Sequence, residues 1–124
     1  MILGIQDVYY NVQDMDKAIY FYTTALGLVL RQKDPWWSSL DCGGVTLGLH
    51  WSENQPVPAV PKDNHGAFAG ATLTLKSNDI QNDRLKLENC GATILSESKQ
   101  TWGHMLVFLD PDGNVLKLMS PAAG

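Results

Sequence analysis

The chain has 124 residues, of which 44% are hydrophobic and 18% charged, so it suits a single globular domain and not a disordered segment. The net charge is −4 with no run of lysine or arginine, which argues against nucleic acid, and no apolar stretch approaches the roughly 18 residues of a membrane span. Cys42 and Cys90 are too few for a disulfide framework, and no signal peptide is visible. We therefore expect a cytoplasmic protein with reduced thiols.

The first half of the chain predicts a strand, a helix and three further strands. Residues 5–12 alternate between apolar and polar side chains, as a half-buried strand does. A helix is expected between Asp14, which caps its first turn, and Gly27, which suits the left-handed position after its last turn. Its apolar stripe consists of Met15, Ala18, Ile19, Tyr22 and Leu26. Further strands are expected at 28–31, 37–41 and 45–51.

Residues 52–68 form the centre of the chain and contain several prolines, which favours irregular structure. We interpret this segment as a linker in preference to a lid over a cavity. The predicted organisation is one domain with a first unit of about residues 1–55, a linker of about 56–66 and a second unit of about 67–124.

The second half repeats the same order of elements. A strand at 70–76 precedes a less amphipathic helix that starts at Asp79 and ends at Gly91, and strands follow at 93–96, 104–109 and 114–119. Residues 110–113, Asp-Pro-Asp-Gly, predict a hairpin turn. The helix caps Asp14 and Asp79 are 65 residues apart, and the closing glycines Gly27 and Gly91 are 64 apart. This nearly constant offset indicates two copies of one unit.

Two motifs resemble a known family. The segment Asp14–Tyr22, followed by Leu26 and Gly27, is similar to the first helix of the vicinal oxygen chelate superfamily, the glyoxalase, bleomycin-resistance and extradiol-dioxygenase group. Residues 110–114 resemble its final hairpin. The resemblance implies an α+β fold in which two tandem βαβββ units form a half-open barrel, with a cavity that dimers commonly complete. It says little about the reaction, because members include lyases, dioxygenases, thiol transferases and non-catalytic binding proteins.

The superfamily's metalloenzymes carry histidine and carboxylate ligands on the first and last strand of each unit. Counted from the helix caps and strand glycines, the resemblance places these positions at Asp7, Gly48, Thr72 and Lys117. Glycine has no ligating side chain, threonine is a poor ligand for a divalent ion, and a lysine ammonium repels a cation. We therefore expect no bound metal and no cofactor. His50 lies two residues beyond Gly48 on the same strand face, which leaves open a displaced site with Asp7.

A ligand site is expected on the strand faces that the superfamily turns toward its cavity. The adjacent Trp36 and Trp37 must point to opposite faces of an extended strand, so one is expected in the core and the other at the cavity. The side chains predicted to bind a ligand are Asp7, Tyr9, Trp36, Trp37, Thr46, His50, Thr72, Trp102, His104 and Lys117. For Lys117 three roles stay open: a pair with Asp7, an anchor for an anionic ligand group, or a wall residue whose ammonium reaches water.

We interpret the chain as a small-molecule binding protein of the glyoxalase and bleomycin-resistance type. It would hold an aromatic or amphipathic ligand in a tryptophan-lined cavity without the usual metal. The alternative is a glyoxalase-like lyase, thiol transferase or dioxygenase-related enzyme with a non-standard site. A third interpretation is a subunit whose dimer interface is its main function. A homodimer is expected, because a partner adds buried surface to a domain of this size.

Overall fold

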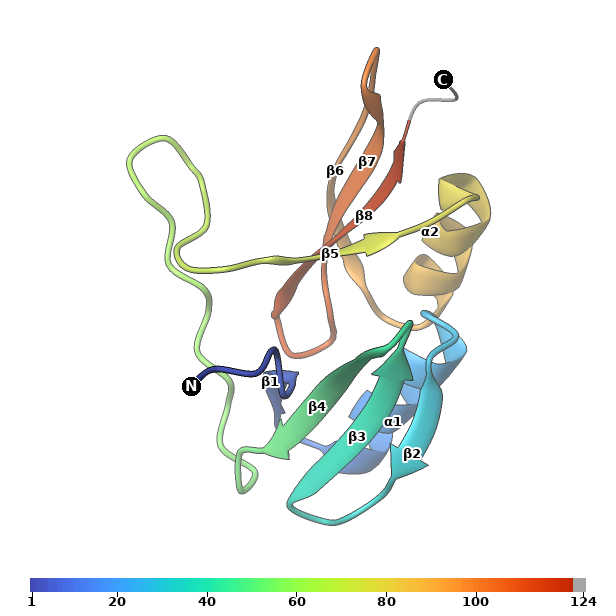
Figure 1. Ribbon diagram of the computed structural model, residues 1–124. Coiled ribbons are helices and arrows are strands. Elements are labelled where there is room, and N and C mark those ends of the chain that lie inside the picture. The colour runs from blue at the N-terminus through green and yellow to red at the C-terminus, as the bar shows by residue number, and fades with distance from the viewer. Residues whose placement is uncertain (122–124) are drawn as a thin grey trace. The chain divides into compact units, whose positions relative to one another are not determined.

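In the computed structural model, which describes residues 1–121, the chain forms two compact units, one from Met1 to Val57 and one from Pro58 onward (Figure 1). Each unit contains one strand, one helix and three further strands in that order, and each builds its own four-stranded mixed sheet. The predicted α+β class and the duplication of a βαβββ unit are therefore confirmed. Each sheet has two edge strands and is open.

The first unit consists of β1 (Val8–Val12), α1 (Met15–Thr24), β2 (Val29–Gln32), β3 (Trp37–Cys42) and β4 (Val45–Trp51). Its strands lie in the order β1-β4-β3-β2, with β1 parallel to β4 and the other pairs antiparallel. A parallel pair cannot be joined by a tight turn, so the chain passes through α1, β2 and β3 before β4 lies beside β1.

Local sequence signals set the bounds of α1. The Asp14 carboxylate accepts a hydrogen bond from the backbone N–H of Lys17 at 3.1 Å and so caps the first turn. The helix ends at Thr24, and Gly27 follows with a φ of 69°, a left-handed conformation that favours glycine. The predicted cap and the predicted closing glycine are therefore both confirmed.

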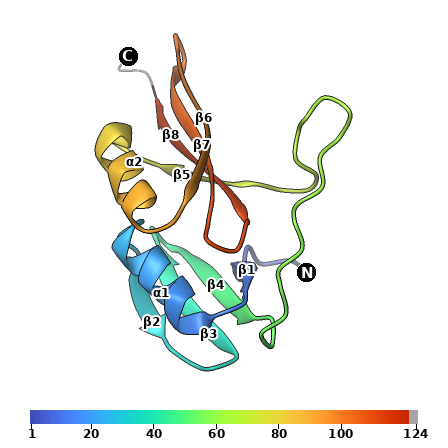
Figure 2. The same cartoon turned by 180° about the vertical axis from the view of Figure 1, so that it is seen from behind.

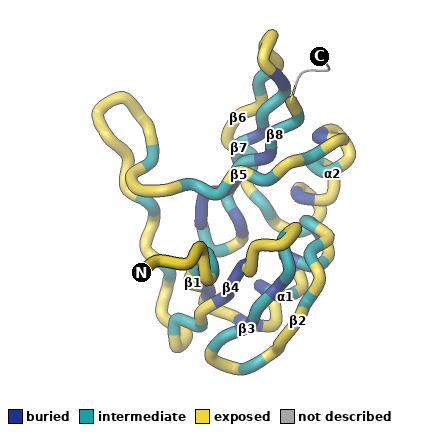
Figure 3. The backbone as a smooth tube through the Cα atoms, viewed as in Figure 1, coloured by how far each residue is buried: buried dark blue, intermediate teal, exposed yellow. Residues whose placement is uncertain are grey.

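The core of the first unit lies between α1 and one face of its sheet (Figures 2 and 3). Its buried side chains from the strands and the helix are Val12, Leu40, Leu47, Leu49, Met15, Ala18, Phe21 and Tyr22. Phe21 was absent from the predicted apolar stripe, but it lies three residues after Ala18 and so on the same helix face. Ile19 and Leu26 are only half-buried. The other face of the sheet is left uncovered by α1.

The second unit consists of β5 (Leu73–Lys76), α2 (Ile80–Asn89), β6 (Thr93–Gln100), β7 (Gly103–Leu109) and β8 (Val115–Pro121). Its strand order, β5-β8-β7-β6 with β5 parallel to β8, is the counterpart of the first sheet. Both helices have ten residues, and within residues 1–121 no helix is long and apolar enough to cross a lipid bilayer.

A helix cap and a hairpin turn, both predicted from the sequence, organise the second unit. Asp79 accepts a hydrogen bond from the backbone N–H of Asn82 at 3.1 Å at the start of α2. At the hairpin turn between β7 and β8, Asp110 Oδ1 accepts from the backbone N–H groups of Asp112 and Asn114, both at 2.9 Å. Each carboxylate accepts hydrogen bonds from backbone N–H groups only a few residues away in the chain. Sequence patterns can therefore predict both the helix start and the turn.

Some bounds differ from the prediction. β5 begins at Leu73 and not at residue 70, and β6 continues to Gln100 instead of ending at residue 96. The polar end of β6 stays extended because it pairs with β7 through backbone hydrogen bonds, which do not require apolar side chains. In the central segment, Lys62 and Phe68 form an isolated bridge, and the Lys62 ammonium lies 4.8 Å from the centroid of the Phe68 ring.

Candidate functional site

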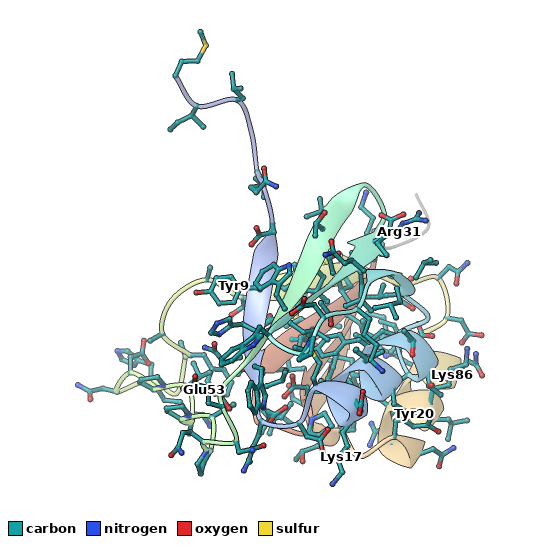
Figure 4. All side chains as sticks on the ribbon, turned by 90° about the horizontal axis from the view of Figure 1, so that it is seen from below. Tyr9, Lys17, Tyr20, Arg31, Glu53 and Lys86 are labelled. Carbon is teal, nitrogen blue, oxygen red and sulfur yellow. The ribbon has the colours of Figure 1, made fainter. Side chains whose placement is uncertain are left out.

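The sheet face that α1 leaves uncovered in the first unit carries rings from three neighbouring strands. Tyr9 of β1 lies opposite Gly48 of β4, and Trp37 of β3 lies opposite His50 of β4. Because side chains alternate along a strand, these residues share one face. Figure 4 shows Tyr9 projecting from β1 on the side away from α1. We call Tyr9, Trp37 and His50 the aromatic platform.

The indole of Trp37 lies directly against Gly48. A Cβ atom added to Gly48 would come within 2.1 Å of Trp37 Cη2 and 2.2 Å of Trp37 Cζ2, far inside van der Waals contact. Glycine at this position therefore lets the ring rest on the backbone of β4. Gly48 is buried beneath the ring, whereas Trp37 itself is half-buried. The space that a side chain at position 48 would occupy is filled by an apolar ring.

Tyr9 completes the platform through two edge-to-face contacts. Its ring centroid lies 5.5 Å from that of Trp37 at an interplanar angle of 64°, and 5.9 Å from that of His50 at 66°. Such contacts are the favoured geometry for aromatic pairs and fix the rings relative to one another. Tyr9 is nevertheless 54% exposed, and His50 is exposed as well. The platform is thus a group of aromatic rings that Tyr9 links by edge-to-face contacts and that remains partly open to solvent.

His50 is oriented by Asn11, its direct partner in the pairing of β1 with β4. His50 Nδ1 lies 3.1 Å from Asn11 Oδ1. An amide oxygen only accepts hydrogen bonds, so this contact is a hydrogen bond in the tautomer that carries its proton on Nδ1. The other ring nitrogen, Nε2, then bears a lone pair and acts as an acceptor. The platform therefore combines apolar rings with one hydrogen-bonding nitrogen.

A polar border adjoins the platform on the same face. Thr46 of β4 is exposed and lies opposite Asp41 of β3. Asp41 accepts a hydrogen bond from Arg31 of β2 at 2.9 Å. This hydrogen bond, together with one from the backbone N–H of Gly44, holds the pKa of Asp41 below its usual range. Both side chains are well exposed, so this ion pair contributes little to the stability of the fold. It places two charged groups at the border of the platform.

Trp36 belongs to a different surface from Trp37, as expected for adjacent residues of an extended chain. It is 53% exposed, and its ring centroid lies 5.0 Å from that of Trp51 at 69°. Beside the start of α1 lies a concavity of about 580 Å³, which is lined by Asp14, Met15, Asp16, Lys33, Asp34, Pro35, Trp51 and Asn54. Trp37, not Trp36, therefore shares a face with Tyr9 and His50.

In the second unit, Lys117 occupies the middle of the face opposite the helix. It lies opposite Thr74 of β5 and Val107 of β7, and it is half-buried. Its neighbours Leu116 and Leu118 are buried on the other face, which agrees with the predicted alternation along β8. The side chains around Lys117 on its own face are therefore mainly aliphatic or hydroxylated rather than aromatic.

His104 lies on the helix side of the second sheet and not on the face of Lys117. Alternation along β7 places it with the buried Leu106. His104 Nε2 lies 3.2 Å from Glu97 Oε2, and the other Glu97 oxygen accepts a hydrogen bond from Arg84 at 3.0 Å. The bond from Arg84, aided by His104, holds the pKa of Glu97 below its usual range. His104 therefore lies beside the Arg84–Glu97 pair, and the structure does not group it with the other predicted binding residues.

Some of the predicted binding residues share one sheet face, and the others lie elsewhere in the structure. The structure brings onto one face Tyr9, Trp37, Thr46 and His50. Asp7 and Thr72 are half-buried in the segments that precede β1 and β5, and Trp102 is 47% exposed in the turn between β6 and β7. Asp7 and Lys117 belong to different units, so the expected pair between them stays a prediction.

Sequence reasoning missed two features of the platform. It did not identify Asn11 as the residue that orients His50, and it treated Gly48 only as a missing ligand. A signal for the second was available, because glycine inside a strand often marks the close approach of another group. No comparable signal exists for Asn11, since its contact depends on the register of two strands.

The residues at the superfamily's metal positions do not fit a divalent ion. Among residues 1–121, no group of three or more histidine, cysteine, aspartate or glutamate side chains is placed to hold a metal. In the first unit the indole of Trp37 covers Gly48, and in the second an ammonium group stands at Lys117. A divalent ion needs several converging nitrogen, oxygen or sulfur ligands. We therefore derive no chemical step through a metal.

Comparison with known proteins places this geometry in context. The family model described as "Glyoxalase/Bleomycin resistance protein/Dioxygenase superfamily" matches residues 4–118. The chain is 32% identical over 120 residues to glutathione transferase FosA of Serratia marcescens, covering 95% of this chain and 81% of that protein. It is 27% identical over 124 residues to metallothiol transferase FosB of Shouchella clausii, covering 95% and 80%.

Among solved structures, the fosfomycin resistance protein FosX from Mesorhizobium loti has a similar fold. Its TM-score is 0.73 at 11% sequence identity, with 98% of this chain and 95% of that chain covered. At so low an identity the likeness concerns the fold, because a shared fold hosts many chemistries.

Proposed function

The chain belongs to the glyoxalase/bleomycin resistance protein/dioxygenase superfamily, and we propose that it binds a planar aromatic or amphipathic small molecule on the aromatic platform without a metal ion. The indole of Trp37 against Gly48 is the observation that carries this proposal. Where the resemblance to metalloenzymes implies a ligating side chain, this chain presents a flat apolar ring. A ring suits stacking and not ligation.

The platform supplies both affinity and orientation. A ligand ring stacked on Trp37 gains on the order of 1 kcal/mol beyond the burial of its apolar surface. Tyr9 meets the indole edge-on, so its ring forms a side wall that limits how the ligand slides across the face. Because the Tyr9 ring already contacts both other rings, little side-chain freedom is lost on binding.

Adjacent tryptophans provide a matched pair of variants to test the proposal. β-Naphthol, a flat bicyclic probe, is titrated against the protein while tryptophan emission is recorded. Trp37→Ala should weaken binding by about tenfold or more, whereas Trp36→Ala, which removes an equal ring from the other face, should change it by less than about twofold. Equal effects of the two variants, or no binding by the wild type, would overturn the proposal.

A second candidate function is transfer of a thiol to a small electrophile. It is favoured by the 32% identity to glutathione transferase FosA. The assay is loss of free glutathione thiol in the presence of fosfomycin, with and without added manganese. Our primary proposal predicts no loss above the protein-free rate in either condition. Turnover in either condition would establish the transferase and remove metal-free binding as the main function.

We further propose that the protein acts as a homodimer in the cytoplasm. Apolar side chains at the start of the chain are strongly exposed, which supports association with a second copy: Met1, Ile2, Leu3 and Ile5. Cys42 and Cys90 are free thiols, which supports a reducing compartment. Light scattering that finds only monomer at micromolar concentration would contradict the dimer.

A further inference from the structure

We infer that His50 determines the specificity of the aromatic platform, by accepting at Nε2 a hydrogen bond from an O–H or N–H group on the edge of the ligand. The ligand class is then a planar aromatic compound with an edge donor, such as a phenol or an anilide. This inference rests on the proposed function, because it concerns the ligand of the same site.

Two neighbouring side chains, Asn11 and Tyr9, orient the imidazole of His50. His50 Nδ1 lies 3.1 Å from Asn11 Oδ1, and because an amide oxygen only accepts, this contact favours the tautomer with its proton on Nδ1. The edge-to-face contact with Tyr9 holds the same ring from another side, at a centroid distance of 5.9 Å. Nε2 is therefore a fixed acceptor, and Asn11 is a positioning residue.

Trp37 and His50 are close enough for one bicyclic ligand to contact both side chains. The two are direct cross-strand partners, and side chains in such pairs have Cβ atoms about 5 Å apart. A bicyclic ligand stacked on the indole extends over this distance, so its rim comes beside the imidazole. The backbone of β3 and β4 at these positions is occupied by the pairing of the two strands.

A lone pair on His50 Nε2 distinguishes a ligand that carries a hydrogen-bond donor from one that does not. A ligand with an O–H on its rim pairs with the lone pair of Nε2, whereas a ligand with a methoxy group has no proton to offer and also displaces water from that nitrogen. The Tyr9 hydroxyl both donates and accepts, so it does not discriminate between such ligands. Because His50 is exposed, we expect a preference of about 3- to 10-fold for the donor.

The experiment compares β-naphthol with its methyl ether, which have the same ring system and differ in the donor. Wild-type protein should bind the naphthol about 3- to 10-fold more tightly. His50→Phe should lower naphthol affinity to that of the ether while it keeps ether binding, because a ring remains at this position. Asn11→Leu should reduce the preference in part. His65→Phe, the same substitution in an exposed loop, should leave the preference unchanged, and Tyr9→Phe tests whether the tyrosine hydroxyl is the acceptor instead.

The outcomes separate the two proposals. If both probes bind equally to the wild type, or if His50→Phe retains the preference, the platform stands and the role of His50 fails. If neither probe binds, the proposed function fails and this inference fails with it. Loss of the preference in Tyr9→Phe assigns the acceptor to the tyrosine instead. Nitrogen NMR of the labelled imidazole gives a test without substitution: His50 Nδ1 should carry the proton, and the Nε2 signal should move with naphthol and not with the ether.

Discussion

Equivalent positions on the open faces of the two sheets carry different side chains. In the first unit Tyr9 lies opposite Gly48, and at the corresponding register of the second unit Thr74 lies opposite Lys117. The next strand pair differs as well: Trp37 opposite His50 is replaced by Met105 opposite Met119. One open face is therefore aromatic around a glycine, and the other is aliphatic around an ammonium group.

On the helix-covered faces, in contrast, the last strand of each unit carries the same residues. Leu47 and Leu49 of β4 correspond to Leu116 and Leu118 of β8, and all four are at most 3% exposed. Every copy of the unit must exclude water between its helix and its sheet, so these positions stay apolar. An open face is free of that requirement. The difference indicates that the side chains of the open face can diverge on a duplicated backbone while the packed leucines of the last strand are kept.

The largest expected effect tests the likeness of the covered faces. Leu47→Ala and Leu116→Ala should each lower the free energy of unfolding by about 2–5 kcal/mol, because each removes a fully buried side chain and leaves a cavity. Urea denaturation followed by circular dichroism measures the change. Thr46→Ala, on the exposed face of the first unit, should change it by less than about 0.5 kcal/mol. If only one leucine is costly, the two cores are not equivalent.

An intermediate effect sharpens the contrast between the open faces. Gly48→Ala should destabilise the protein by about 1–3 kcal/mol, because its methyl group overlaps the indole of Trp37 and the ring must move. The displaced ring should also weaken β-naphthol binding. In the Trp37→Ala background the same Gly48→Ala change should cost much less, which a double-mutant cycle detects. Additive costs of the two substitutions would show that the ring does not rest on Gly48.

A smaller effect is expected from the carboxylates that form an ion pair with an arginine, one in each unit. Arg31 lowers the pKa of Asp41, and Arg84 lowers that of Glu97. A carboxyl group with a lowered folded-state pKa contributes stability above its unfolded pKa, about 4, and the contribution is lost as pH falls through the folded-state value. Asp41→Asn and Glu97→Gln should therefore each lower the thermal midpoint slightly at pH 7, and the difference from wild type should vanish at low pH. A difference that persists in acid would exclude the ion pairs as its cause.

The last prediction is that the positions where the resemblance implies metal ligands bind no metal ion. After dialysis, elemental analysis should find no stoichiometric zinc, nickel, manganese or iron, and adding these ions should not shift the thermal midpoint. The reason is that Gly48, Thr72 and Lys117 supply no ligand for a cation. About one metal ion per chain would overturn this prediction and would favour the thiol transferase.

Local features of the fold were predictable from the sequence, because they depend on residues that are close together in the chain. Asp14 and Asp79 bond backbone groups three residues ahead of them, so both helix starts could be located without tertiary information. The repeated spacing of these caps revealed the duplication in the same way. The turn at Asp110 belongs to this class, since its carboxylate satisfies donors within the turn itself.

The site depended on tertiary structure, because its contacts join strands that are distant in sequence. Alternation grouped the side chains on each strand face, and the family resemblance implied that Tyr9 and His50 lie on open faces. The approach of Trp37 to Gly48, however, required the register of β3 against β4. Alternation along β7 places His104 with Leu106, but its approach to Glu97 required the pairing of β6 with β7. Asn11 and His50 are 39 residues apart, and only the parallel pairing of β1 with β4 brings the amide oxygen to the imidazole nitrogen.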